Sequence, residues 1–254
     1  MHHVVLEGHS ASVMESASYS IRWGHRLVGM DSPTIHPLVK GVVEGAQRKL
    51  ARPVHPKEPL KHDSIAEITL SLGYASASLA DIRFLFILLV GYEGVFRISE
   101  ILSIRVRDVA ISYDFMKVYL IKRKNDQYRD GHVSVIAESR KPTCPGGITE
   151  RILSLLPDFS GSSYPIVRRI INSRHSKERF HESLGISYST AYASFKSYIS
   201  PFVSDASLYG TQSIRIGGAN DEGQACWLKN LKSKFRYLET VPEQLVEIAR
   251  SRSI

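Results

Sequence analysis

The chain has 254 residues, of which 43% are hydrophobic and 23% charged, a composition that excludes intrinsic disorder of the whole chain. The net charge of +8 favours a polyanionic partner, nucleic acid before an anionic membrane, although a basic enzyme of another kind also fits. Two cysteines, Cys144 and Cys226, are too few for a disulfide framework and form no CxxC zinc motif.

Nothing in the sequence predicts a membrane span or a secretory leader. The longest apolar run, Phe84 to Val90, is far shorter than the roughly 20 residues that cross a bilayer. The first ten residues contain no apolar core flanked by positive charge. We therefore expect an intracellular protein, cytosolic or, in our preferred interpretation, nuclear.

The first part of the chain predicts two helices. Residues 12–28 have a weak helical pattern, whereas after Pro37 apolar residues recur at helical spacing as far as Leu50. Prolines at 53, 56 and 59 then disfavour helix and predict an extended linker. We expect three parts: a helical segment 1–52, a proline-rich linker 53–60 and a main domain 61–254.

The main domain begins with helices and then changes period. Residues 64–72 and 78–90 predict helices, and the second is apolar nearly all round, as expected of a buried central helix. A turn at Gly91 and Gly94 leads into another short helix. Alternating apolar residues at 116–120 and 133–136, separated by a polar stretch, predict a β-hairpin or small sheet.

The rest of the chain is expected to be mostly helical. Helices are predicted after the Pro-Gly-Gly break at 145–147, at 187–199, from Gln212, in a segment that ends near Tyr237, and at 243–250. The predicted fold is therefore mainly α with a small antiparallel β-sheet, an α+β arrangement.

Common nucleotide, zinc and hydrolase motifs are absent, and a few cations and one tyrosine carry the chemistry instead. Arg97 begins a helix among apolar residues, where its charge needs a partner; taken alone it favours a structural ion pair, with Glu100 as one candidate. Lys124, or with less support Lys122, lies in the hairpin, where a lysine is usually just solvated.

Two further residues come later in the chain. Arg215, followed by two glycines at a helix start, could grip a phosphate with two parallel hydrogen bonds, although a surface arginine fits as well. Tyr237 follows a run of basic residues, where a packing tyrosine on a solvated basic helix is the simpler interpretation.

The order of these four residues resembles the tyrosine recombinase (phage-type integrase) family, and most closely the recombinases of DIRS-like and Ngaro-like retrotransposons. The resemblance runs from about Ser18 to the end of the chain. It is carried by SPTIHPLVKGVVEGAQRKLARPV, FRISEILSIRVRDV, the KRKNDQYRDG hairpin, SLYGTQSIRIGGAN and RYLETVPEQLVEIARS.

Membership would imply site-specific cleavage and rejoining of double-stranded DNA. Tyr237 would attack a phosphodiester and form a 3′-phosphotyrosine, Arg97 and Arg215 would stabilise the phosphate, and Lys124 would protonate the leaving 5′-hydroxyl. No metal and no cofactor would be required. Further basic residues expected to contact DNA are Lys122, Arg123, Lys229, Lys232, Lys234 and Arg236.

The chain also departs from the family pattern. Gln212 stands where the family has a histidine, and an amide cannot act as a base at neutral pH. Trp227 is the candidate for the family's third histidine or tryptophan. Arg215 and Tyr237 are 237 − 215 = 22 positions apart, about ten fewer than is usual, which predicts a missing segment worth ~15 Å of helix. The family's N-terminal helical bundle is represented only by its last helices.

Three functions therefore stay open. The preferred one is a recombinase-like protein from a mobile element, active or degenerate. The second is a catalytically inactive DNA-binding protein that keeps the scaffold and the cations. The third is a helical RNA-binding or adaptor protein with fortuitous motifs. The family acts as a tetramer that exchanges C-terminal helices, so a homo-oligomer is open as well, with 243–250 either exchanged or packed on its own chain.

Overall fold

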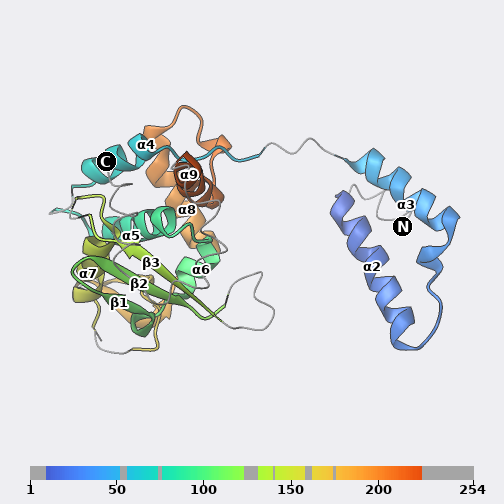
Figure 1. The fold of residues 1–254 in the computed structure, drawn as a ribbon, viewed down its shortest axis with the longest axis horizontal. Helices are drawn as coiled ribbons and strands as arrows, with labels where there is room; N and C mark the ends of the chain where they lie inside the picture. Colours follow the sequence, from blue (N-terminus) through green and yellow to red (C-terminus); the bar gives the residue numbers. More distant parts are fainter. Residues whose placement is uncertain are drawn as a thin grey trace. The chain divides into compact units, whose positions relative to one another are not determined.

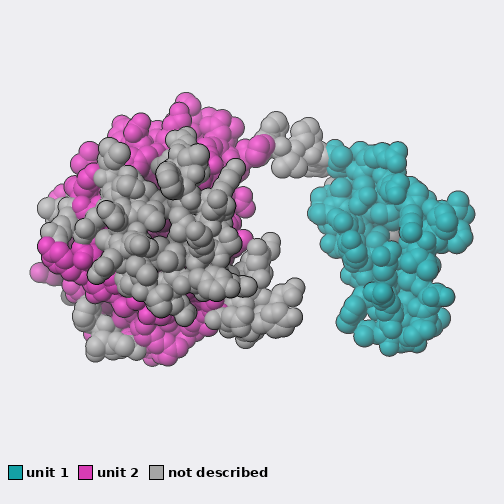
Figure 2. Space-filling model, in the orientation of Figure 1, with its two compact units in different colours: residues 1–55 teal, residues 56–254 magenta. Residues whose placement is uncertain are grey.

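A computed structural model describes residues 10–51, 56–73, 76–122, 131–139, 141–157, 162–173 and 176–224. Contacts within the chain divide it into two compact units, residues 1–55 and 56–254 (Figures 1 and 2). The helices predicted near Tyr237 and at 243–250 lie outside the described residues.

The first unit is a pair of helices that matches the sequence prediction for this part of the chain. Helix α2 (Ala11–Leu27) leads through the 3-10 helix η1 (Pro33–Ile35) to helix α3 (Pro37–Leu50). Pro37 occupies the first turn of α3, where the helix needs no N–H from it. Met14 and Ala46 are the buried hydrophobic residues of the two helices, so the described core of this unit is small.

The second unit is built around one buried helix. Helix α4 (His62–Ser71) precedes the central helix α5 (Leu79–Glu93), which is followed by the short helix α6 (Ile98–Ser103). Every residue of α5 from Phe84 to Tyr92 is buried, as the all-round apolar pattern predicted. Figure 1 shows α5 running through the middle of the unit, with α4 and α9 on one side and the three-stranded sheet with α7 on the other.

The end of α5 corrects one detail of the prediction. Gly91 was expected to form a turn, but it lies within the helix, which continues to Glu93. A Cβ at Gly91 would lie 2.7 Å from Cδ1 of Ile101 and 3.1 Å from Cγ2 of Ile214. The glycine is therefore used for close packing of α5 against α6 and α9, and the turn begins only at Gly94.

A three-stranded antiparallel sheet follows, in the order β1-β2-β3. After the 3-10 helix η2 (Val106–Asp108) come β1 (Val109–Ile111), β2 (Phe115–Leu120) and β3 (His132–Ala137). Met116, Val118 and Leu120 are buried, which confirms the predicted alternation in β2. Helix α7 (Pro145–Ser154) packs against β2, β3 and α5.

A second antiparallel hairpin interrupts the region that was expected to be mostly helical. It consists of β4 (Arg168–Ser173) and β5 (Ser176–Gly185), and its register shifts twice. Helix α8 (Tyr188–Ile199) then leads through the 3-10 helices η3 (Ser200–Phe202) and η4 (Ala206–Leu208) to α9 (Thr211–Gln224). The predicted fold class is confirmed: the described chain is mainly helical with small antiparallel sheets.

Candidate nucleic-acid interface

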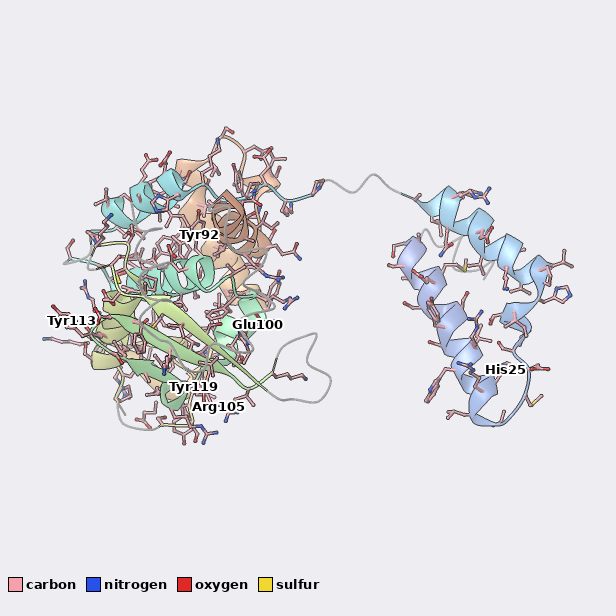
Figure 3. The ribbon with its side chains drawn as sticks, in the orientation of Figure 1. His25, Tyr92, Glu100, Arg105, Tyr113 and Tyr119 are labelled. Atoms are coloured by element: carbon pink, nitrogen blue, oxygen red, sulfur yellow. The ribbon has the colours of Figure 1, made fainter. Side chains whose placement is uncertain are left out.

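Arg97 caps the start of α6 and is held there by Glu100. Its backbone N–H donates to Oε2 of Glu100 at 2.8 Å, and its guanidinium donates from Nη1 to Oε1 at 3.0 Å. The side chain of Glu100, labelled in Figure 3, is 4% exposed, whereas that of Arg97 is 27% exposed. The buried carboxylate therefore fixes the guanidinium, while the Arg97 side chain as a whole stays partly exposed.

Arg215 reaches the loop that leads into Arg97. It lies in α9, and its Nε donates to the backbone carbonyl of Val95 at 3.2 Å. Val95 is two residues before Arg97 and has a φ of 52°, a left-handed conformation that is uncommon for a β-branched residue. The loop that presents Arg97 is thus tied to the helix that carries Arg215, and a strained residue stands between the two.

The two glycines after Arg215 let α9 approach the end of α5 closely. A Cβ at Gly218 would lie 2.0 Å from the carbonyl oxygen of Tyr92, and one at Gly217 would lie 2.8 Å from the Tyr92 ring and 2.1 Å from the carbonyl oxygen of Leu60. Tyr92 is labelled in Figure 3. Because both obstacles are mainly backbone, a larger residue would push α9 away. The two glycines therefore allow α9 to pack closely on α5, and this packing determines the position of the helix that carries Arg215.

Gln212 lies on the first turn of the same helix, exposed to solvent, while its neighbours Thr211 and Ser213 are buried. The hydroxyl of Tyr188, from α8, lies 3.3 Å from Oγ1 of Thr211. The exposed amide of Gln212 and the half-buried guanidinium of Arg215 therefore come from one helix. Tyr188 was not singled out from the sequence, because only the fold brings α8 to the start of α9.

The other candidate residues divide into one that is described and several that are not. Lys122 lies two residues after the end of β2 and is exposed. The remaining candidates lie outside the described residues: Arg123, Lys124, Trp227, Lys229, Lys232, Lys234, Arg236 and Tyr237. The structure therefore ties Arg215, which shares α9 with Gln212, to the loop that leads into Arg97, and the roles of all the candidate residues stay predictions.

A polar contact links the first turn of α5 to α8. Tyr198 donates its hydroxyl proton to Oδ1 of Asp81 at 2.6 Å, and its ring stacks on Phe84 at a centroid distance of 4.2 Å. Burial and the hydrogen bond to Asp81 raise the pKa of Tyr198. Burial alone would raise the pKa of Asp81, but hydrogen bonds from Tyr198 and Ser78 outweigh it and hold that pKa below its ordinary value.

The described part of the chain offers neither a metal-binding cluster nor a membrane span. No group of three or more histidine, cysteine, aspartate or glutamate side chains in these residues is arranged to hold a metal ion. Nor does any helix there combine the length and the apolar character that crossing a bilayer demands.

No family model and no curated protein matches the chain, whereas several solved structures resemble it. The XerH site-specific recombinase bound to its difH substrate before cleavage is 10% identical over 96% of this chain and 66% of that chain, with a TM-score of 0.46. XerH on a palindromic difH substrate after cleavage is 11% identical over 78% and 49%, with a TM-score of 0.43. A lambda integrase dimer bound to a COC′ core site is 11% identical over 95% and 64%, with a TM-score of 0.44. This chain spans less than two thirds of each of those chains.

Proposed function

We propose that the chain is a tyrosine recombinase-like protein that binds duplex DNA and cleaves and rejoins its strands through Tyr237. One observation carries the proposal: Arg215, from α9, is bonded to the loop that presents Arg97, 118 positions earlier in the sequence (215 − 97 = 118). In this proposal the two guanidiniums share one phosphate and stabilise the negative charge that it gains as it is attacked.

The reaction follows from the roles that the resemblance assigns. The phenol of Tyr237 loses its proton to solvent water as its oxygen forms a bond to phosphorus, the bond from phosphorus to the 5′-oxygen breaks, and Lys124 gives that oxygen a proton. The product is a 3′-phosphotyrosine and a free 5′-hydroxyl. Because the new ester conserves the energy of the phosphodiester, attack by a 5′-hydroxyl reverses the step and rejoins a strand without a cofactor.

Glu100 and Gln212 have supporting parts in this proposal. Glu100 holds Arg97 in one orientation, because its carboxylate accepts hydrogen bonds from both the backbone and the side chain of Arg97. The entropic cost of ordering this side chain on phosphate binding is therefore reduced. Gln212 is exposed on the first turn of α9, where its amide can donate to a phosphate oxygen but cannot take a proton from Tyr237.

The proposal is tested by trapping the covalent intermediate. A library of nicked duplexes of random sequence, in which the cleaved fragment diffuses away, is incubated with the full chain and run on a denaturing gel. The proposal predicts an SDS-stable protein–DNA adduct with the parent chain and none with Tyr237→Phe. Tyr113→Phe, an exposed tyrosine on the turn between β1 and β2, is the matched control and should leave the adduct intact.

A second candidate is a catalytically inactive DNA-binding protein that keeps the same surface. Gln212 favours it, since the family's histidine is replaced by a group that cannot act as a base. The spacing of 22 positions between Arg215 and Tyr237 favours it too (237 − 215 = 22). Salt-sensitive duplex binding without any adduct would support this candidate, and an adduct lost in Tyr237→Phe would exclude it.

The proposal extends to the organisation of the chain. We infer that 61–254 has the architecture of a tyrosine recombinase catalytic domain, that 1–52 is related to the helical DNA-clamping domain of the family, and that 53–60 links them. Origin from a DIRS-like or Ngaro-like mobile element, a nuclear location and assembly into a homo-oligomer on DNA belong to the same proposal.

A further inference from the structure

The last five residues of the proline-rich linker run alongside the segment that leads into α9. We call Pro56–Leu60 the strap. The backbone N–H of Glu58 donates to the carbonyl of Leu208 at 2.9 Å, and that of Leu60 donates to the carbonyl of Ser213 at 3.0 Å. The strap is therefore bonded both before the start of α9 and in its first turn.

The backbone of Leu60 approaches α9 on both sides of Arg215 along the helix. Ser213, whose carbonyl accepts from the strap, is two residues before Arg215, and Gly217, two residues after, would place a Cβ 2.1 Å from the carbonyl oxygen of Leu60. Residues 213 and 217 lie on the same helix face, one turn apart. Leu60 itself is 1% exposed, so its side chain anchors the strap in the core.

Two side chains add to the backbone bonds. Lys57 donates from Nζ to the carbonyl of Ser207 at 2.6 Å, and Tyr209 donates from its hydroxyl to Oε2 of Glu58 at 3.1 Å. Burial and the bond to Glu58 raise the pKa of Tyr209, so its hydroxyl keeps its proton at neutral pH. We call the bond between Tyr209 and Glu58 the latch.

The segment under the strap is also held from α8. Lys196 donates from Nζ to the carbonyl of Tyr209 at 2.6 Å and to that of Ala206. Residues 206–209 therefore lie between an amine from α8 and the backbone of the strap. Residues 206–209 lead into α9, so a displacement of the strap would be transmitted to the first turn of that helix.

We propose that the strap positions Arg215 relative to Arg97, with the bond between Glu58 and Tyr209 as its latch. This rests on the proposed function, because it assigns Glu58 and Tyr209 to the placement of a phosphate-binding arginine. Neither residue touches the phosphate; each acts through Ser213 and the start of α9. The latch lies at the surface, so it is weak and its loss shifts α9 without unfolding the domain.

Amide hydrogen exchange tests the positioning without DNA. The Leu60 and Glu58 amides donate the strap's own bonds, so their exchange reports its opening. In Tyr209→Phe we expect both to exchange about threefold to tenfold faster, the factor that one net hydrogen bond corresponds to. Glu58→Ala should match it, and Glu58→Gln, which keeps an acceptor, should stay close to the parent. Unchanged exchange in Tyr209→Phe with intact melting would overturn the proposal.

A double-mutant cycle tests whether the latch acts through Arg215. We expect Tyr209→Phe to weaken duplex binding a few-fold in the parent and to have no further effect in an Arg215→Ala background. Tyr113→Phe is the charge-neutral control and should change neither. An equal loss in both backgrounds would show that the latch does not act through Arg215. If no variant binds DNA but the amide exchange responds as expected, the proposed function fails and the positioning stands.

Discussion

Nε of Arg215 lies 3.2 Å from the carbonyl oxygen of Val95, a hydrogen bond between residues 120 positions apart. Val95 lies in the four-residue connection from Gly94 to Arg97 between α5 and α6, and Phe96 in this connection is fully buried. The bond therefore joins the helix that carries one candidate phosphate ligand to the loop that carries the other. The predictions below follow from how this arrangement is held.

The ion pair between Arg97 and Glu100 should contribute measurably to stability. Glu100→Gln removes a charge from a site that is 4% exposed and leaves the Arg97 guanidinium with a neutral acceptor in place of its ion-pair partner. We expect the free energy of unfolding to fall by about 1–3 kcal/mol, less than for a fully buried pair because Arg97 is partly in water. Urea unfolding of the full chain measures it.

The control for this prediction is a surface pair with the same chemistry. Arg48 and Glu44 form an exposed contact at 3.5 Å within α3, so Glu44→Gln should lower stability by less than about 0.5 kcal/mol. Equal effects of the two substitutions would mean that Glu100 is not the anchor of Arg97.

Close packing of α9 on α5 should make Gly218 intolerant of a side chain. In Gly218→Ala the new Cβ would meet the carbonyl oxygen of Tyr92 at 2.0 Å, so α9 must shift. We expect a loss of about 1–3 kcal/mol from overpacking, together with weaker duplex binding because Arg215 moves. Calorimetry measures the first effect and a duplex titration the second.

Gly45 in α3 provides the contrast, since an added Cβ there meets nothing within 4 Å. Gly45→Ala should stabilise its own helix by about 0.5–1 kcal/mol, the difference in helix propensity between the two residues. If Gly218→Ala behaved like Gly45→Ala, the tight contact between α5 and α9 would be refuted.

Asp81 should make stability depend on pH in the acid range. Since its folded pKa lies below the ordinary value of 3.8, the unfolded state takes up a proton first as the pH falls. The stabilisation is therefore complete above pH 3.8 and is lost as the pH drops through the folded pKa.

The variant that tests this is Asp81→Asn, which weakens the bonds to Ser78 and Tyr198. We expect a loss of about 1–2 kcal/mol at pH 7, from one helix cap and one tertiary hydrogen bond, that shrinks toward pH 3. Asp63→Asn, in the first turn of α4, removes the same charge and should cost less. A difference between parent and Asp81→Asn that stayed constant down to pH 3 would argue against the assignment.

Local patterns predicted much of this fold, and the misses have identifiable causes. The nearly all-round apolar run predicted α5 as a buried central helix, and the need of Arg97 for a partner at a helix start pointed to Glu100. The hairpin of β4 and β5 was missed because its register shifts between Arg168 and Ile170 and again between Ile171 and Ser173. Such irregularities break the two-residue alternation by which a strand is recognised. Arg168 adds to the difficulty, because it is a charged residue that is fully buried.

The candidate site was predicted residue by residue but not as an arrangement. Arg97 and Arg215 were each compatible with an ordinary surface or structural role, and their connection through Val95 depends on a contact across 120 positions that no local pattern encodes. The strap was missed for the same reason: the prolines at 53, 56 and 59 predicted an extended linker, and the sequence of an extended segment does not identify its partner. Tertiary structure supplied the partner in both cases.

The most direct test of the central claim is the affinity of the full chain for a generic duplex at several salt concentrations, with Arg97→Ala, Arg215→Ala and the double variant. If both guanidiniums hold one phosphate, each single variant weakens binding about tenfold and lowers the salt slope by about one, and the double variant loses less than the product of the two. Arg179→Ala, at an exposed pair with Glu182 on β5, removes the same charge and should lower affinity much less. Affinity and slope that are unchanged in Arg97→Ala and Arg215→Ala, or equal to those of Arg179→Ala, would contradict the account.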